Sequence, residues 1–278
     1  MEPRDVLKNI STIILNVSGG MDSAVASTVA VSVAESLASK PKIYMVYAHT
    51  PLALEENKQY VEKLARWLGV ELRVVYPRDG GGLEALTRRG WPNPFVGARW
   101  CMYHWKLYPI IDFSKTTLAP RVHVLGIRVH ESIRRFNLFG SQGDIWFYCL
   151  KSPRYCGYYY APILRWKKED VQRAVREYGI PQNPLWGEKG HSSHDCTICI
   201  AYANASDYRV LKTRHPEIWE KLYRAYREMN EKNRRGRKIL ASHYVDLDSI
   251  AREKTLLDYS EPREKCRACL ITQELLGG

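Results

Sequence analysis

The sequence lacks several features that mark other classes of protein. It has no run of about eighteen apolar residues, which a membrane-spanning helix needs, and no basic start followed by an apolar core, which a secretory signal needs. It also lacks the G-x-x-x-x-G-K-[ST] pattern of a Walker A loop, and it shows no internal repeat or low-complexity linker. We therefore expect a cytoplasmic protein without membrane attachment.

Cysteine is sparse, and its count is odd. The seven cysteines include two C-x-x-C pairs. An odd count argues against a disulfide framework and suits metal or sulfur chemistry in a reducing compartment, except in hyperthermophiles, whose intracellular proteins often carry disulfides. Cys149 and Cys156 belong to neither pair, and we expect both to be buried, unreactive thiols.

Negative charge is in short supply. Lysine and arginine number 42 against 30 acidic residues, which gives a formal net charge of +12 and a pI near 9.3. Such an excess points to a polyanionic partner, with nucleic acid (tRNA or DNA) as the commonest one. Basic residues are mixed with acids over 121–135, 165–176 and 209–238, so solvated helix faces account for part of the excess.

The most informative motif is S-G-G-M-D-S at 18–23, which follows an apolar run and opens a stretch of small residues. Two glycines let the backbone approach phosphate oxygens, serine hydroxyls add donors, and the N-terminus of the next helix favours anions. Asp22 suits a magnesium ion carried by the phosphates. An ordinary Ser/Gly turn near a helix N-cap is the alternative. The predicted pyrophosphate site consists of Ser18, Gly19, Gly20, Met21, Asp22 and Ser23.

Apolar runs and amphipathic stretches alternate along the first part of the chain. The predicted elements are strands at 13–17, 43–48, 71–76 and 122–126, order again at 158–163, and helices at 22–38, 55–68, 83–88, from about 100, and 168–178. This alternation predicts an α/β fold with a mostly parallel, doubly wound sheet and ligands at the carboxyl ends of its strands.

The pattern changes to helices alone near residue 205. Helices are predicted at 207–212 and 216–233, ahead of a tail that carries cysteines. We therefore expect a nucleotide-binding domain over 1–204 and a helical C-terminal extension over 205–278.

Three further motifs carry basic and sulfur-bearing residues. They are R-W-C at 99–101 followed by Lys106, G-I-R at 126–128 followed by Glu131, Arg134 and Arg135, and a run from 162 to 185 followed by C-T-I-C at 196–199. Arginine grips phosphate or sulfate by two parallel hydrogen bonds, so Arg128 and Arg134 are candidate anion ligands, with Glu131 orienting one of them. The alternatives are a surface ion-pair cluster for this group and a solvated helix face for Arg99 and Lys106.

The loop and the three motifs, in this order over residues 11–236, resemble the phosphoadenosine phosphosulfate (PAPS) reductase family in its broad sense. That family includes sulfonucleotide reductases and the ATP-using enzymes of DNA phosphorothioation, and the loop resembles the PP-loop of ATP pyrophosphatases. The resemblance implies an adenine nucleotide α hydrolase-like fold. It also implies that nucleotide is bound by the loop together with Arg99, Lys106, Gly126, Arg128, Glu131 and Arg134.

The sequence departs from this family in two places. His49 stands where similar proteins carry the aspartate of an Asp-Thr-Gly motif, and it suits packing or capping. The tail reads E-K-C-R-A-C at 264–269, whereas the reductases have Glu-Cys-Gly-[Ile/Leu]-His, whose cysteine attacks sulfur.

The cysteine pairs predict a metal site. Cys101 occupies the position that supplies a ligand in iron–sulfur members of the family, and with Cys196, Cys199 and either Cys266 or Cys269 it suits a [4Fe-4S] cluster. Zinc held by the two C-x-x-C pairs and a dithiol redox pair are the alternatives. We expect His191 and His194 to be polar loop residues.

The resemblance implies an enzyme of sulfur metabolism, a PP-loop ATP pyrophosphatase and sulfurtransferase. It would bind ATP and Mg²⁺, transfer AMP to an oxygen of an acceptor such as nucleic acid, release pyrophosphate, and support sulfur transfer from a donor protein. Asp22, Ser23 and Arg128 are the expected catalytic residues. Two alternatives are a PAPS or adenylyl-sulfate reductase that releases sulfite, and a non-catalytic nucleotide-binding subunit of a sulfur-modification complex.

Overall fold

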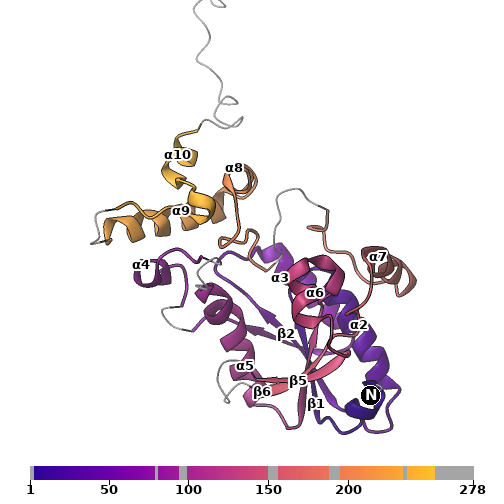
Figure 1. Cartoon of the computed structure of the whole chain (residues 1–278). Coiled ribbons are helices and arrows are strands. Elements are labelled where there is room, and N and C mark those ends of the chain that lie inside the picture. Colours follow the sequence, from indigo (N-terminus) through magenta and orange to yellow (C-terminus); the bar gives the residue numbers. More distant parts are fainter. Residues whose placement is uncertain are drawn as a thin grey trace, which may run out of the picture.

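The fold is built on one mostly parallel sheet (Figure 1). The computed structural model describes residues 3–78, 81–93, 99–149, 156–187, 195–233 and 237–253. The strands lie in the order β3-β2-β1-β4-β6-β5, and every pair is parallel except β5 with β6. Their bounds are β1 Thr12–Val17, β2 Lys42–Ala48, β3 Glu71–Val75, β4 Arg121–Leu125, β5 Ile145–Cys149 and β6 Cys156–Tyr160. The predicted α/β fold is confirmed.

Helices cover both faces of the sheet. The helices are α1 Pro3–Leu7, α2 Met21–Glu35, α3 Glu55–Trp67, α4 Ala85–Arg89, the π-helix η1 Met102–Leu107, α5 Tyr108–Lys115, the 3₁₀ turn η2 Val129–Glu131, α6 Ile133–Phe139, α7 Lys168–Glu177, α8 Ala205–Arg214, α9 Pro216–Glu231, the 3₁₀ turn η4 Ser242–Tyr244 and α10 Leu247–Arg252. Alternate residues of β1 and β2 pack with α2, α3 and α7 in one hydrophobic cluster. Contacts of β2 and β3 with α5 cover the opposite face.

The sequence patterns place most of these elements correctly. The apolar run of β1 is buried along almost its whole length, as a central parallel strand must be. The small residues of α2 are buried on most sides, which lets this helix lie close to the sheet. Gly69 and Gly179 close α3 and α7 with positive φ angles of 64° and 65°, which glycine adopts without strain.

The prediction misses the elements between residues 129 and 149. The sequence suggests only a polar segment there, whereas the structure has η2, α6 and β5. No residue of α6 is buried and β5 is largely exposed. The sequence signals were present but were not recognised: Ile133, Phe136 and Phe139 recur at helical spacing, and I-W-F-Y-C at 145–149 is an apolar run of strand length. The short helices α1 and α10 were also not predicted.

The expectation for Cys149 and Cys156 is wrong. Both residues are exposed, and a disulfide joins them. Antiparallel pairing of β5 with β6 places the two cysteines directly opposite each other. Their seven-residue separation gave no sign of this pairing, because the hairpin that creates it was not recognised.

The C-terminal helices share a hydrophobic cluster with segments of the first part of the chain. Leu52, Leu86 and Trp105 are buried in the same cluster as Leu222 and Tyr226 of α9. The aromatic residues of α9 therefore serve packing, as their helical spacing suggests. The domain boundary near residue 205 stays a prediction. Within the described ranges, no helix combines the length and the apolar character that crossing a membrane requires.

This shared cluster generates a prediction about stability. Leu222→Ala is expected to lower the free energy of unfolding by about 2–5 kcal/mol, because the side chain is fully buried and its loss leaves a cavity. Chemical denaturation followed by circular dichroism should show one transition shifted as a whole. Leu118→Ala is the control, because that side chain is 72% exposed and its truncation should matter by less than about 0.5 kcal/mol. Two separate transitions, only one of them shifted, would contradict a shared cluster.

Candidate functional site

The loop at 18–23 connects β1 to α2 at the carboxyl end of the sheet. Gly19 has a φ of 87°, and Gly20 is the N-cap of α2. The Ser23 hydroxyl donates to the Gly20 carbonyl at 2.8 Å and accepts from the Ser18 N–H at 3.3 Å, which closes the turn. The first N–H groups of α2 have no acceptor within the helix, and together with its positive dipole end they favour an anion here.

Side chains behind the loop hold its carbonyl groups. Asn57 of α3 donates to the Ser18 carbonyl at 3.0 Å. Asn183 and Trp186 both donate to the Gly19 backbone carbonyl, at 3.0 and 2.9 Å. Asn183 also donates to the side-chain oxygen Oδ1 of Asn57 at 2.9 Å. Both asparagines are almost completely buried. This network fixes the loop from the side opposite an incoming anion.

Sequence reasoning missed Asn57 and Trp186. Asn57 belongs to an amphipathic helix in which an asparagine normally faces solvent, and only the packing of α3 against the loop buries it. The signal that was available is Gly19 itself. A Cβ at position 19 would lie 1.9 Å from the side-chain oxygen Oδ1 of Asn57. The contact with Asn57 and the positive φ angle therefore both favour glycine at this position.

Four predicted residues meet between the ends of β1 and β4. The Arg128 Nε atom donates to the Asp22 carboxylate at 2.9 Å, and the two side chains are only 11% and 22% exposed. Gly126 lies directly against the start of α2, since a Cβ there would be 2.5 Å from the Ser23 backbone nitrogen. Asp22, Ser23, Gly126 and Arg128 are thus one group, as the motifs suggest.

Two other predicted arginines converge on a tyrosine. The Arg99 guanidinium lies 5.1 Å from the centre of the Tyr202 ring, and Arg134 donates to the Tyr202 hydroxyl at 3.1 Å. The Arg99 Nε atom is buried, and no described residue accepts from it. Tyr202 was not singled out in the sequence. Glu131 accepts from Arg135, and its expected orienting of Arg128 or Arg134 stays a prediction.

Lys106 lies in the π-helix and faces the C-x-x-C segment. Its ammonium forms an ion pair with Asp195 at 2.8 Å and interacts with the neighbouring Cys196 thiol. Burial alone would lower the pKa of Lys106, but Asp195 and Cys196 outweigh burial and raise it. Burial raises the pKa of the Cys196 thiol to about 12, although Lys106 acts in the opposite direction.

The predicted metal ligands are only partly described. Cys101 and Cys196 belong to the same buried cluster, and burial together with the nearby Cys199 raises the pKa of Cys101. In the ranges that the structure describes, no three His, Cys, Asp or Glu side chains gather closely enough to hold one metal ion. Cys266, Cys269, His191 and His194 lie outside the described residues. The predicted cluster and zinc sites therefore stay predictions.

His49, the residue that departs from the family pattern, packs between aromatic rings. It lies 5.9 Å from the Tyr47 ring and 5.6 Å from the Tyr76 ring. Burial lowers the pKa of His49, which favours the neutral form. A neutral packing residue therefore occupies the end of β2.

A loop that carries glycines and serines connects the central strand β1 to α2, and Asp22 lies in the first turn of that helix. This arrangement defines a PP-loop type of nucleotide-binding fold. The chain belongs to the phosphoadenosine phosphosulfate reductase domain family, whose model matches residues 12–209. Members of this family are enzymes. No curated protein sequence matches the chain.

Several solved structures are similar to the chain. Phosphoadenylyl-sulfate (PAPS) reductase from Candida auris, in its phosphate complex, shares 16% identity over 66% of this chain and 83% of its own, with a TM-score of 0.45. The U34-tRNA thiolase NcsA from Methanococcus maripaludis, with its [4Fe-4S] cluster, shares 15% identity over 93% and 86%, with a TM-score of 0.49. NMN synthetase from Francisella tularensis shares 15% over 82% and 87%, with a TM-score of 0.47. At this level of similarity, nothing about activity follows.

The close approach of β4 to the loop generates the next prediction. Gly126→Ala is expected to destabilise the chain by about 1–3 kcal/mol and to weaken nucleotide binding, because its Cβ would push the start of α2 away. Gly143→Ala is the matched control, since a Cβ there meets its nearest atom at 3.8 Å. Denaturation and calorimetric titration with ATP measure both effects. Equal behaviour of the two variants would show that the start of α2 tolerates displacement.

Proposed function

We propose that this chain binds ATP with Mg²⁺ on the loop at 18–23, splits it between the α- and β-phosphates, and adenylates an acceptor as a step toward sulfur transfer. The observation that carries the proposal is the partly buried pairing of Asp22 with Arg128 at the N-terminus of α2. An ion pair beside a phosphate-binding helix end offers a carboxylate for a metal ion and a cation for phosphate in one place.

The proposed chemistry is an in-line displacement. An acceptor oxygen attacks the α-phosphorus, the bond from phosphorus to the bridging oxygen breaks, and pyrophosphate leaves with that oxygen. Such a reaction needs positioning and charge stabilisation more than covalent help from the protein. The amides of α2, Ser18, Ser23 and Arg128 are the groups that would bind the phosphates and stabilise the developing charge.

The Asp22 carboxylate suits a magnesium ion. Arg128 engages one of its oxygens, and no described residue donates to the other. Mg²⁺ is commonly held by one or two carboxylates together with substrate phosphates and water, so one available carboxylate oxygen fits this mode of binding. The ion would neutralise phosphate charge, while Asp22 fixes its place on the loop.

We further propose that the cysteines bind a [4Fe-4S] cluster that supplies iron to which sulfur can bind. Thiols are the usual ligands of such clusters, and Cys101, Cys196 and Cys199 come from two segments in or beside one buried cluster. The fourth ligand would be Cys266 or Cys269. The acceptor is proposed to be a nucleic acid because of the net charge of +12, and the sulfur to come from a donor protein.

A sulfonucleotide reductase is the second candidate. It is favoured by membership of the PAPS reductase family and by the convergence of Arg99 and Arg134 at Tyr202, which suits a sulfate or phosphate group. In this reaction a cysteine thiolate attacks the sulfur of PAPS or adenylyl sulfate, the bond from sulfur to the phosphate oxygen breaks, and the nucleotide leaves. A thiol donor then attacks the cysteine sulfur and releases sulfite, and no ATP is cleaved. A nucleotide-binding subunit without catalytic activity would cleave neither nucleotide.

The two reactions predict different products. Anaerobically purified protein is expected to release pyrophosphate from ATP when an acceptor is present, and to bind ATP more tightly than PAPS. Asp22→Ala and Ser23→Ala should each lower the rate by a factor of about 10²–10³, which is typical for loss of one group that stabilises transition-state charge. Pyrophosphate and sulfite are measured side by side, together with competition binding of ATP and PAPS at fixed salt.

The control for these loop variants is Asp112→Ala, which removes an exposed carboxylate paired with Arg78 far along the chain from the loop. Sulfite release with preference for PAPS would favour the reductase, most clearly if removal of residues 264–278 abolished it without changing nucleotide affinity. Unchanged ATP binding and turnover in both loop variants would overturn the assignment of the loop.

The cluster proposal has its own test. Protein purified without oxygen is expected to be brown and to hold iron and sulfide, and Cys196→Ala is expected to lose all three features. Cys149→Ser with Cys156→Ser is the matched control, because these cysteines bond to each other and should leave the iron unchanged. Colourless protein with stoichiometric zinc would instead support a structural zinc site.

A further inference from the structure

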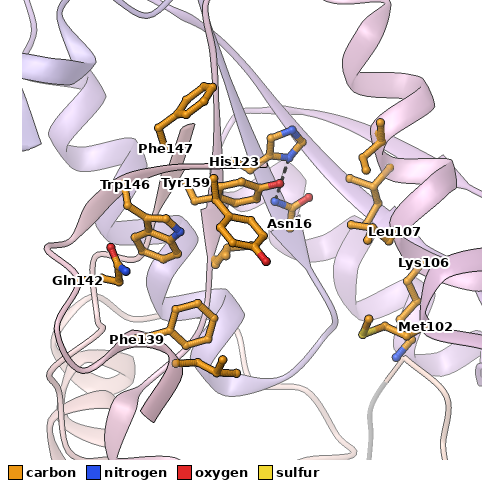
Figure 2. Close-up of a pocket in the computed structure, with 15 residues that line it drawn as sticks. Asn16, Met102, Lys106, Leu107, His123, Phe139, Gln142, Trp146, Phe147 and Tyr159 are labelled. Carbon is orange, nitrogen blue, oxygen red and sulfur yellow. Dashed lines mark hydrogen bonds between the residues drawn. The ribbon is translucent and has the colours of Figure 1, made fainter. Parts of the chain in front are cut away.

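A cavity of about 490 Å³ lies on the α5 side of the sheet (Figure 2). The cavity is lined by residues of β1, β4, β5 and β6 and by residues of α5, α6 and the π-helix η1. This volume is within the range of small-molecule sites. The ATP proposal leaves the cavity without a role.

One wall of the cavity is a row of aromatic rings on three neighbouring strands. Tyr159 of β6 lies between His123 of β4 and Trp146 of β5, at centroid distances of 5.7 and 6.1 Å. The ring planes differ by only 28° and 20°. Phe139 adds a further ring against Trp146, as Figure 2 shows. Near-parallel rings of this kind favour a flat, aromatic ligand that stacks.

Asn16 of β1 has a side-chain oxygen that needs a hydrogen-bond donor. Its amide nitrogen donates to the Val124 carbonyl at 3.1 Å and to the His123 Nδ1 atom at 3.3 Å, which fixes the orientation of the amide. Burial lowers the pKa of His123 to about 4, so the ring is neutral near pH 7 and its Nδ1 atom accepts this bond. The Asn16 carbonyl oxygen is then left buried, with no donor among the described residues. A ligand that donates an N–H satisfies it.

The charged residues around the cavity indicate where its ligand comes from. None of the described lining residues is acidic, and Lys106 is the one cation among them. No residue of the loop at 18–23 lines the cavity, nor does Arg128. Lys106 instead connects the cavity to Asp195 and to the Cys196 thiol. Lys106 is therefore a residue that the cavity shares with the cysteine segment.

We infer that this cavity binds a nucleobase of the acceptor: the planar ring lies against Trp146 and Tyr159, and a ring N–H or amino group faces Asn16. The binding of a base is independent of the proposed ATP reaction. Its assignment to the acceptor rests on that reaction. A base bound here would lie beside Lys106, which contacts the segment that carries Cys196.

Ligand-observed NMR titration with nucleosides tests this inference on the full chain, with and without ATP. Uridine is the probe, because N3–H is the only donor on its base, and N3-methyluridine, which lacks it, is expected to bind more weakly. Trp146→Leu should weaken nucleoside binding at least about fivefold, which corresponds to the loss of ~1 kcal/mol from one base–aromatic stack. ATP affinity should stay within about twofold of the parent value, since no loop residue lines the cavity.

Trp67→Leu is the matched control, because that tryptophan lies on α3 and is 42% exposed. Thermal unfolding checks that both variants are folded. Equal nucleoside binding by Trp146→Leu and Trp67→Leu, or no binding to the parent chain, would overturn the inference. Loss of ATP affinity in Trp146→Leu would show that the adenine of ATP binds in the cavity, and it would overturn the assignment of the cavity to the acceptor. Nucleoside binding without any pyrophosphate release would remove the acceptor role while leaving the base site intact.

Discussion

The parallel pairing of β1 with β4 is the constraint on which the site depends. In this register the two strands end side by side, so the loop after β1 meets the segment after β4. Gly126 then lies against the backbone of Ser23, and Arg128 reaches Asp22. A side chain at Gly126 would separate these segments and, with them, the ion pair at the start of α2. The chemistry proposed for the loop therefore rests on a backbone contact.

Two structural supports act on this site from different directions. Asn57, Asn183 and Trp186 hold the loop carbonyls from the α3 side. On the other side of the sheet, Asn16 is held by Val124 and His123, and its carbonyl oxygen remains for a ligand. Asn16 of β1 and the loop that follows β1 thus serve two separate spaces.

Features that depend on local sequence were predicted, whereas those that depend on contacts between distant segments were not. The β-α-β order, the ends of α3 and α7 and the phosphate loop depend on local periodicity and on glycines, which are visible in the sequence. The largely exposed β5 was not recognised as a strand, so the Cys149–Cys156 disulfide that its pairing with β6 creates was missed as well. The ion pair of Lys106 with Asp195 was not foreseen, because it joins segments 89 residues apart in the chain.

The sequence by itself determined the fold class, the family and the glycine-bearing loop between β1 and α2, because each depends on short stretches whose residue types have few structural alternatives. Tertiary structure alone decided which polar side chains become buried partners. Asn57 and Asn16 look like ordinary polar residues, and they gain their roles from helices and strands distant in sequence that remove them from water. Burial depends on what packs against a residue, and a linear pattern does not contain that information.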